Sequence, residues 1–327
     1  MKLLAAMVLL ALPVIGAVDG VVVNQTTGKP QPDVTVTLIR LGQGMETAGS
    51  AKTDGQGHFA IAQDVPQGSP ALIQALYSGV TYNKMLPPGM PASGVNVEVF
   101  ESSTKASTAK VAQHMMLLEP SGTELAVSES IVFVNDGKLT FNDPEGGTLQ
   151  FYLPPAAAGK VRVTVNGPQG MPLQKPAEKA PGANTYKVKY PVKPGETRFD
   201  LSYSLPMPNP PVFESKVLHG DSPLRIVAPK GVQLSGEGVT SLGPEPRTQA
   251  TIYDVKGAAY KVEIAGTGSL RASAEAAPQE DQGPPIEESK PRVYDRIYML
   301  LALSLSILLI GFILLYRAEA PATKSHS

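Results

Sequence analysis

The sequence predicts an all-β ectodomain of tandem β-sandwich domains attached to one C-terminal transmembrane helix. Short runs of alternating apolar and polar residues recur along most of the chain, which is the pattern of half-buried strands. Glycine and proline number 31 each without a repeating period, a composition typical of a turn-rich β protein. Residues 297–316 (IYMLLALSLSILLIGFILLY) carry no charge, and a helix of that length rises about 30 Å, enough to cross the hydrocarbon core of a bilayer.

Residues 1–17 have the pattern of a secretory signal peptide. A positive start at Lys2 is followed by an apolar run over residues 3–15, and Gly16-Ala17 supplies small residues for cleavage. An uncleaved N-terminal anchor is the alternative, and in both cases residues 18–292 lie outside the cytoplasm. An exported chain without cysteine indicates a bacterial envelope protein rather than a small secreted module held by disulfides.

Residues 18–101 are expected to form the first domain. The run VTVTL at residues 34–38 alternates and predicts a half-buried strand. The dipeptide Asp54-Gly55 suits a tight hairpin turn, after which the chain re-enters the core. Further strands are expected at residues 71–77, 80–83 and 95–100.

Four motifs in this first domain follow one another in a familiar order: GVVV at residues 20–23, TGKP at 27–30, VTV at 34–36 and TDGQGHF at 53–59. Together they resemble the carboxypeptidase regulatory-like domain, which is related to collagen-adhesin B-type repeats and classed with carbohydrate-binding-like folds. The resemblance implies a seven-stranded transthyretin-like sandwich over residues 18–101, within an ectodomain of immunoglobulin-like or transthyretin-like sandwiches. It implies an accessory or stalk module without catalytic residues and no peptidase activity, since a metal-binding protease domain has no counterpart here.

Residues 105–270 are expected to continue the all-β pattern. Strand signals recur at intervals of about 8–14 residues, as in a sandwich, and no amphipathic helix interrupts them. The sequence Asn135-Asp136-Gly137-Lys138 predicts another hairpin turn. The proline-rich segment 206–211 favours a division into a β-sandwich at 105–211 and a β-rich domain at 212–270, with one continuous domain as the alternative.

Composition excludes several classes of chemistry. The net charge of −1 provides no basic field for nucleic acid, so we expect no nucleic-acid partner. The absence of cysteine removes thiol catalysis, iron–sulfur clusters and cysteine-based zinc sites. The chain contains no H-E-x-x-H, G-x-S-x-G or complete G-x-G-x-x-G motif. We therefore expect no catalytic residues, no metal site and no cofactor, and the protein is predicted not to be an enzyme.

A hydrolase remains a minor alternative because of the histidines. His219, Asp221 and Ser222 bring three suggestive residue types together, but adjacent residues in one turn cannot form a catalytic triad by themselves. The hypothesis becomes untenable if His58, His114 and His219 prove mutually distant and solvent-facing.

Eight residues are candidates for ligand or partner contacts. Tyrosines could stack on sugar rings, since the chain has no tryptophan, although each tyrosine could instead be half-buried in its own sheet. Two proline-stiffened apolar loops could contact another protein or could be packed crossovers between strands. The tyrosine candidates are Tyr77, Tyr82, Tyr190 and Tyr203, and the loop candidates are Met85, Met90, Met207 and Phe213.

The C-terminal region is expected to attach the ectodomain to the cytoplasmic membrane in a single pass. Residues 271–296 are rich in proline, glutamate and glutamine and predict a disordered, extended stalk. Residues 297–316 would span the membrane and residues 317–327 would form a short cytoplasmic tail. The sequence thus favours a non-catalytic, membrane-anchored protein that binds another envelope protein or serves as a scaffold. The alternative is a module that binds carbohydrate, such as a polysaccharide or peptidoglycan.

Overall fold

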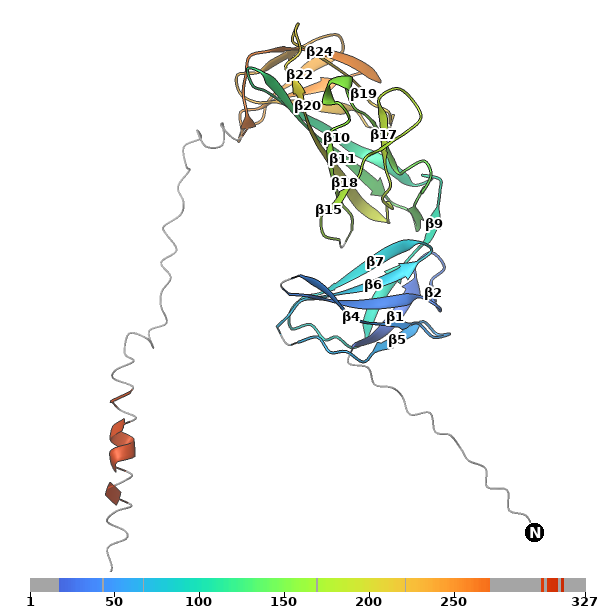
Figure 1. Ribbon diagram of the computed structural model, residues 1–327, viewed down its shortest axis with the longest axis vertical. Coiled ribbons are helices and arrows are strands. Elements are labelled where there is room, and N and C mark those ends of the chain that lie inside the picture. The colour runs from blue at the N-terminus through green and yellow to red at the C-terminus, as the bar shows by residue number, and fades with distance from the viewer. Residues whose placement is uncertain are drawn as a thin grey trace, which may run out of the picture. The chain divides into compact units, whose positions relative to one another are not determined.

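The computed structural model describes residues 18–270, except 43, 67, 169 and 221, together with residues 301–302, 305–310 and 313–314. Strands β1 to β24 occupy most of the first range, which confirms the all-β prediction (Figure 1). A single turn of 3-10 helix, η1 (Pro155–Ala157), interrupts them among these described residues.

The N-terminal domain consists of two sheets that enclose one core. One sheet has the order β4-β3-β6-β7, and in the other β1 pairs with β2, β5 and β8. Apolar residues alternate inward from both sheets, as Val36 and Leu38 on β3 and Val97 on β8 illustrate. The strands are β1 (Val18–Asn24), β2 (Lys29–Pro30), β3 (Thr35–Leu41), β4 (Met45–Lys52), β5 (His58–Ile61), β6 (Ala71–Tyr77), β7 (Val80–Leu86) and β8 (Val95–Val99).

Both predicted hairpin turns exist as turns but do not form hairpins. At Asp54-Gly55 the amide of Gly57 donates to the carbonyl of Asp54, yet β4 pairs with β3 and β5 pairs with β1. The turn therefore carries the chain from one sheet to the other. Asn135 ends a strand in the same way, because the following strand β12 (Leu139–Phe141) pairs with β9 (Glu101–Ser103). A turn sequence predicts a local reversal, but tertiary packing selects the pairing partner.

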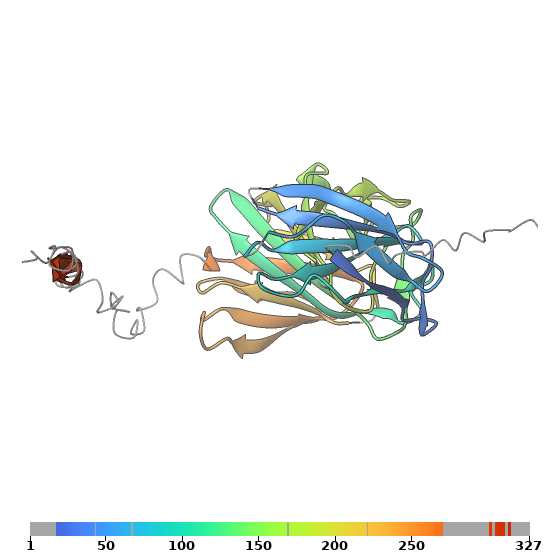
Figure 2. The ribbon, with the colours of Figure 1, turned by 90° about the horizontal axis from the view of Figure 1, so that it is seen from below.

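The second region contains an eight-stranded sheet with the order β15-β14-β18-β11-β10-β20-β23-β22. Figure 2 shows the strands of the chain from a second side. Its strands are β10 (Ala109–Pro120), β11 (Glu124–Asn135), β14 (Arg162–Asn166), β15 (Leu173–Lys175), β18 (Gly195–Pro206), β20 (Leu224–Ala228), β22 (Val239–Pro244) and β23 (Thr251–Val255). Strand β10 pairs with β11 on one side and, in parallel, with β20 on the other. Strands from both sides of residues 206–211 therefore share this sheet.

Two three-stranded sheets accompany the eight-stranded one. They have the orders β13-β17-β16 and β19-β24-β21. Buried side chains from residues 109–264 form a single hydrophobic cluster, with Phe199 and Phe213 among its largest members. The strands are β13 (Leu149–Tyr152), β16 (Glu178–Lys179), β17 (Thr185–Val188), β19 (Val212–Lys216), β21 (Gln233–Ser235) and β24 (Ala259–Ala265).

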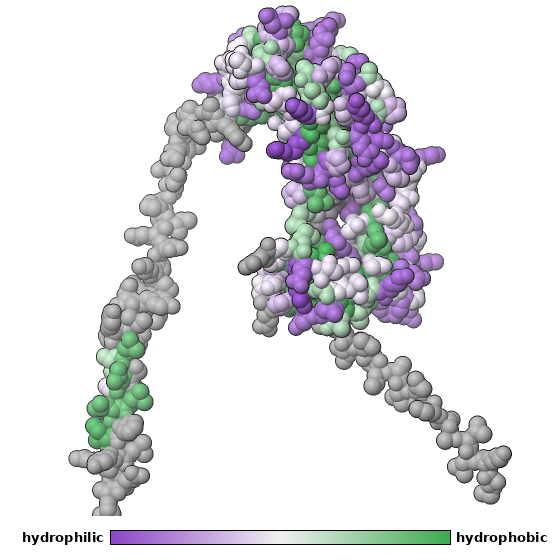
Figure 3. All heavy atoms as spheres, viewed as in Figure 1, coloured by the Kyte–Doolittle hydropathy of each residue, from purple (hydrophilic) through white to green (hydrophobic). Residues whose placement is uncertain are grey.

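The C-terminal residues that the structure describes are helical and apolar. Residues 305–310 are exposed on every side, and in Figure 3 this stretch presents an almost continuous hydrophobic surface. Within the described residues, no helix reaches the length and apolar character needed to cross a membrane. The predicted span 297–316 lies partly outside those residues, and the predicted signal peptide 1–17, stalk 271–296 and tail 317–327 lie outside them altogether.

Candidate functional site

Three of the four tyrosine candidates are enclosed by protein. Tyr82 is 3% exposed, and its hydroxyl lies 2.8 Å from both the Phe100 carbonyl and the Thr140 hydroxyl. Burial raises the pKa of Tyr82 to about 12. Tyr190 and Tyr203 are also buried, in the core of the second region. Their rings contact the core rather than solvent.

Tyr77 lies at the edge of the N-terminal core and takes part in a polar network. Its hydroxyl donates a 2.6 Å hydrogen bond to Oε1 of Glu101. The buried side chain of Asn24 donates to the same carboxylate at 2.8 Å. Burial, together with the neighbouring Glu101 carboxylate, raises the pKa of Tyr77. The network fixes the end of β1 against β9, where the chain leaves the first domain.

The two proline-rich loops differ in their exposure. Met90 is 56% exposed and borders a shallow pocket of about 740 Å³ formed with residues 64–66, 68 and 69, while Met85 is half-buried on β7. Phe213 is 2% exposed and Met207 packs against the same core. The first loop is therefore available to a partner, whereas the second anchors its segment in the domain.

An apolar groove of about 630 Å³ lies on the outer face of the eight-stranded sheet. Met115 and Leu117 project into it from β10, Val227 from β20 and Ile252 from β23. Their strand neighbours on the opposite face are buried in the core, so the alternation of β10 is apolar on both faces. Outer faces of antiparallel sheets are usually polar, so a half-buried apolar strip here is unusual.

The rim of the apolar groove is polar and internally satisfied. Asp200 accepts hydrogen bonds from Ser130 and Asn166 and pairs with Arg198 at 3.0 Å. Glu245 accepts from the amide and hydroxyl of Thr248, which lowers the pKa of that carboxyl. These groups have partners within the fold, and the apolar side chains of the groove are half-buried.

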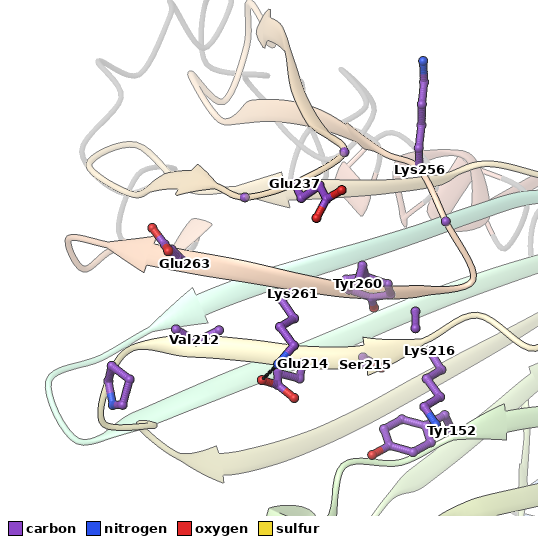
Figure 4. A pocket seen from close by; sticks show the side chains of 15 residues that line it. Tyr152, Val212, Glu214, Ser215, Lys216, Glu237, Lys256, Tyr260, Lys261 and Glu263 are labelled. Atoms are coloured by element: carbon purple, nitrogen blue, oxygen red, sulfur yellow. Dashed lines mark ion pairs between the residues drawn. The ribbon is translucent and has the colours of Figure 1, made fainter.

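A second, charged groove of about 1110 Å³ crosses the outer face of the sheet β19-β24-β21 (Figure 4). Glu214 on β19 pairs with Lys261 on β24 at 2.6 Å. The amine of Lys216 lies 5.5 Å from the centre of the Tyr152 ring. The remaining lining combines charged and small residues, with Glu237, Lys256, Glu263, Gly236, Gly238, Gly257 and Ala259 among them.

A chain of three ionisable side chains runs from the core to the end of the second region. Oε1 of Glu129 lies 3.0 Å from Nε2 of His114, and Nδ1 of His114 lies 2.9 Å from Nε2 of His219. Glu129 on β11 and His114 on β10 are buried, at 6% and 3% exposed. His219 is half-buried in the loop after β19 and lines a pocket of about 380 Å³. The structure therefore brings together two of the histidines whose separation would have removed the hydrolase alternative.

The surroundings of Glu129 are apolar apart from this chain and two tyrosines. Oε2 of Glu129 and the hydroxyl of Tyr203 are buried and have no hydrogen-bond partner among the described residues. Burial, and then the Glu129 carboxylate, raise the pKa values of Tyr203 and Tyr260. Buried polar groups are normally paired, so an unpaired carboxylate oxygen together with an unpaired tyrosine hydroxyl marks an unusual place in the core.

The sequence carries a signal for Glu129 that the search for catalytic motifs passes over. Leu125, Val127, Ile131 and Phe133 form the inward face of β11, and Glu129 occupies the central position of that period-two stripe. A carboxylate at an inward position requires a partner. The inward position of His114 has no such signal, because a β-bulge between Val111 and Gln113 shifts the register of β10.

His58 lies apart from this chain of side chains. It is exposed on β5 of the N-terminal domain and lies 3.8 Å from Asp54. Within the part of the chain that the structure describes, no group of three histidine, cysteine or acidic side chains is placed to hold a metal ion. Asp54 caps its own turn by accepting from the amides of Gln56 and His58, which lowers the pKa of the Asp54 carboxyl.

The comparisons with known proteins do not assign the chain to a family. No protein-family model matches the chain, and no curated protein sequence matches it. Among solved structures, the M1 zinc metallopeptidase from Deinococcus radiodurans is similar over 48% of this chain and 42% of its own, with 13% sequence identity and a TM-score of 0.27. A mutant of that metallopeptidase bound to a Tyr-Ser-Ala substrate gives the same identity and TM-score, with 43% of that chain covered. The chain thus spans less than half the length of these structures, and a TM-score this low carries no argument.

Proposed function

We propose that this protein is a non-catalytic, single-pass membrane protein of the bacterial envelope whose ectodomain binds an apolar segment of another envelope protein. The apolar groove on the eight-stranded sheet is the observation that carries the proposal. Apolar side chains from the three adjacent strands β10, β20 and β23 help to line a cavity of about 630 Å³ on a face that is normally polar. A partner segment that covered them would gain about 25 cal/mol for each Å² of apolar surface removed from water.

The membrane anchor is proposed from the apolar C-terminal stretch. Its described residues are helical, and large apolar side chains such as Leu305, Leu308 and Ile313 are each at least 50% exposed. A helix that is apolar on every side needs an apolar environment. A preceding signal peptide and a stalk over residues 271–296 would place the ectodomain on the extracytoplasmic side.

The N-terminal domain is proposed to be an accessory module of the carboxypeptidase regulatory-like, transthyretin-like type. Its two sheets of four strands and its shared core support this proposal. The contact of Tyr82 with Thr140 joins it to the second region. Such a module would present the groove-bearing domain rather than perform chemistry.

The experiment is affinity purification of the full-length protein from detergent-solubilised membranes. Wild-type protein is expected to retain one stoichiometric envelope protein, and Leu117→Glu in the groove is expected to weaken its binding at least tenfold. Leu76→Glu is the matched control, because Leu76 is 53% exposed on β6 of the other domain and lies outside the groove. Recovery of no stoichiometric partner, or equal loss of binding in both variants, would reject the proposal.

Carbohydrate binding is the second candidate, favoured by the charged groove in Figure 4. Its volume of about 1110 Å³, its charged and small lining residues and the Tyr152 ring suit a polar ligand. The competing feature is that Lys216 covers the Tyr152 ring. A glycan array probed with residues 18–270, compared with the Lys261→Glu variant, tests this candidate: absence of any glycan signal removes it.

A further inference from the structure

Two polar atoms in the core of the second region have no hydrogen-bond partner among the described residues. They are Oε2 of Glu129 on β11 and the hydroxyl of Tyr203 on β18. Each side chain is 6% exposed, so bulk solvent does not satisfy either atom. Unpaired polar atoms in a core cost free energy, and native proteins normally pair them with protein groups or with ordered water. These two atoms therefore require a partner beyond the side chains around them.

The register of the eight-stranded sheet places these two side chains close together. On β18, Tyr203 lies two residues beyond Leu201, the residue that pairs with Glu129 on β11. Glu129 and Tyr203 are therefore diagonal neighbours on the inner face of the sheet, a separation of about 7–8 Å that long side chains can bridge. The Glu129 carboxylate is near enough to contribute to the raised pKa of Tyr203. The two unpaired atoms thus belong to one part of the core.

The other polar groups beside Glu129 already have partners. Oε1 of Glu129 lies 3.0 Å from Nε2 of His114, which leaves Oε2 as the free oxygen of the carboxylate. The hydroxyl of Tyr260 on β24 donates to Sδ of Met116 at 3.7 Å, and Met116 pairs with Glu129 across β10 and β11. The oxygen of the Tyr260 hydroxyl retains acceptor capacity. Oε2 of Glu129 thus has polar neighbours but no direct partner.

The chemistry of the two unpaired atoms selects a small, neutral ligand. A carboxylate oxygen accepts hydrogen bonds, whereas a tyrosine hydroxyl donates one and can also accept. A water molecule can donate to Oε2 of Glu129 and accept the hydrogen of the Tyr203 hydroxyl, and it brings no charge into the core. A metal ion suits the place less well, because the described residues include no group of three histidine, cysteine or acidic side chains positioned to hold one. Internal waters typically bind at places where about two to four polar groups converge.

We propose that one internal water molecule binds between β11 and β18 and bridges Oε2 of Glu129 to the hydroxyl of Tyr203. The water gives both buried atoms a partner. It ties the carboxylate to β18, as the contact with His114 ties it to β10, so that Glu129 links three adjacent strands of the sheet. This site lies on the inner face of the sheet and does not depend on partner binding at the apolar groove on the outer face.

A crystal structure of the full-length protein in detergent, at a resolution that shows ordered water, tests the site directly. The wild type should show one peak of density within about 2.5–3.0 Å of both oxygen atoms. Tyr203→Phe removes one of the two partners, and the peak should disappear. Tyr186→Phe is the matched control, because it makes the same change at a half-buried tyrosine on β17 and should keep the peak. A wild type without the peak, or with a direct hydrogen bond between Glu129 and Tyr203, would overturn the proposal whether or not the variants fold.

Oxygen-17 magnetic relaxation dispersion gives an independent count in solution, because it detects waters that stay inside a protein much longer than surface waters. In the full-length protein, Tyr203→Phe should lower the number of long-lived internal waters by about one relative to the wild type. Tyr186→Phe should leave the number unchanged, and circular dichroism should show the same β-structure in all three proteins. An equal count in Tyr203→Phe and the wild type, or an equal loss in both variants, would contradict the proposed bridge.

Discussion

The amine of Lys193, in the second region, lies 5.2 Å from the centre of the Tyr82 ring, in the N-terminal domain. The same amine donates a hydrogen bond to the carbonyl of Thr81 on β7. Lys193 is 8% exposed, and its burial lowers the pKa of its amine to about 8. A cation that is held between two domains and has no carboxylate partner among these contacts costs stability in its charged form.

This cost predicts an unusual dependence of stability on pH. The folded-state pKa of about 8 lies below the ordinary value of 10.5, so the unfolded chain binds more protons between these limits. The free energy of unfolding should therefore rise with pH, by about 2 kcal/mol between about pH 7 and about pH 9.5, on account of this group. Denaturant unfolding followed by circular dichroism measures the rise.

Two substitutions isolate the contribution of Lys193. Lys193→Met removes the titrating group, so its stability should lack the rise seen in the wild type over the same interval. Lys105→Met is the control, since Lys105 is exposed and its loss should leave the rise in place. Tyrosines with raised pKa values act in the opposite sense as the pH approaches about 10, and they are present in the wild type and in both variants. Equal pH profiles for the wild type and Lys193→Met would contradict the prediction.

The hydroxyl of Tyr82 is expected to stabilise the same contact. It is the link between the Phe100 carbonyl and the Thr140 hydroxyl, and removing it leaves these buried partners without that hydrogen bond. Tyr82→Phe should lower the free energy of unfolding by about 1–2 kcal/mol. Thr140→Val in the Tyr82→Phe background should cost little more. Full additivity of the two substitutions would show that the groups do not interact.

Much of the strand pattern followed from the sequence because burial imposes a period of two. Strand β6 (Ala71–Tyr77) was predicted with the bounds it has, and Leu125 to Phe133 alternate inward along β11 as expected. The sequence pattern did not predict which strands pair with each other. Asp54-Gly55 joins two sheets instead of two adjacent strands, because the local turn does not decide which strand lies beside β5.

The candidate sites were harder to predict than the strands. The apolar groove depends on side chains from β10, β20 and β23. These strands are neighbours only because of the order of strands in the sheet, which the local sequence does not reveal. The contact of His114 with His219 joins residues 105 positions apart and needs a bulge to turn His114 inward. Long-range pairing and a one-residue bulge leave no clear trace in local composition.

Gly20 should tolerate no side chain. A Cβ atom at this position would lie 2.0 Å from the carbonyl oxygen of Val95, its partner in the parallel pairing of β1 with β8. Gly20→Ala must therefore displace backbone and should cost about 3 kcal/mol or more. Gly44→Ala, where nothing lies within 4 Å, should change stability by less than about 0.5 kcal/mol. Thermal unfolding of both variants checks the contrast, and similar midpoints would contradict it.

The buried pair of Glu129 and His114 should behave as a unit. Glu129→Leu leaves the Nε2 hydrogen of His114 without an acceptor in the core, so it should lower the free energy of unfolding by about 3 kcal/mol at about pH 7.5. Glu129→Gln keeps an acceptor at the same place and should cost clearly less. Denaturant unfolding of each variant gives these values.

The double variant His114→Leu, Glu129→Leu tests whether the polar pair makes a net contribution to the stability of the fold. The alternative is that each side chain only supplies the hydrogen-bond partner that the other one needs. Replacing His114 as well removes the unpaired Nε2 hydrogen that Glu129→Leu leaves in the core, so the double variant should be more stable than Glu129→Leu alone. That recovery would mean that the carboxylate and the imidazole are retained for a purpose other than stability. A double variant less stable than Glu129→Leu would instead assign the pair a structural role.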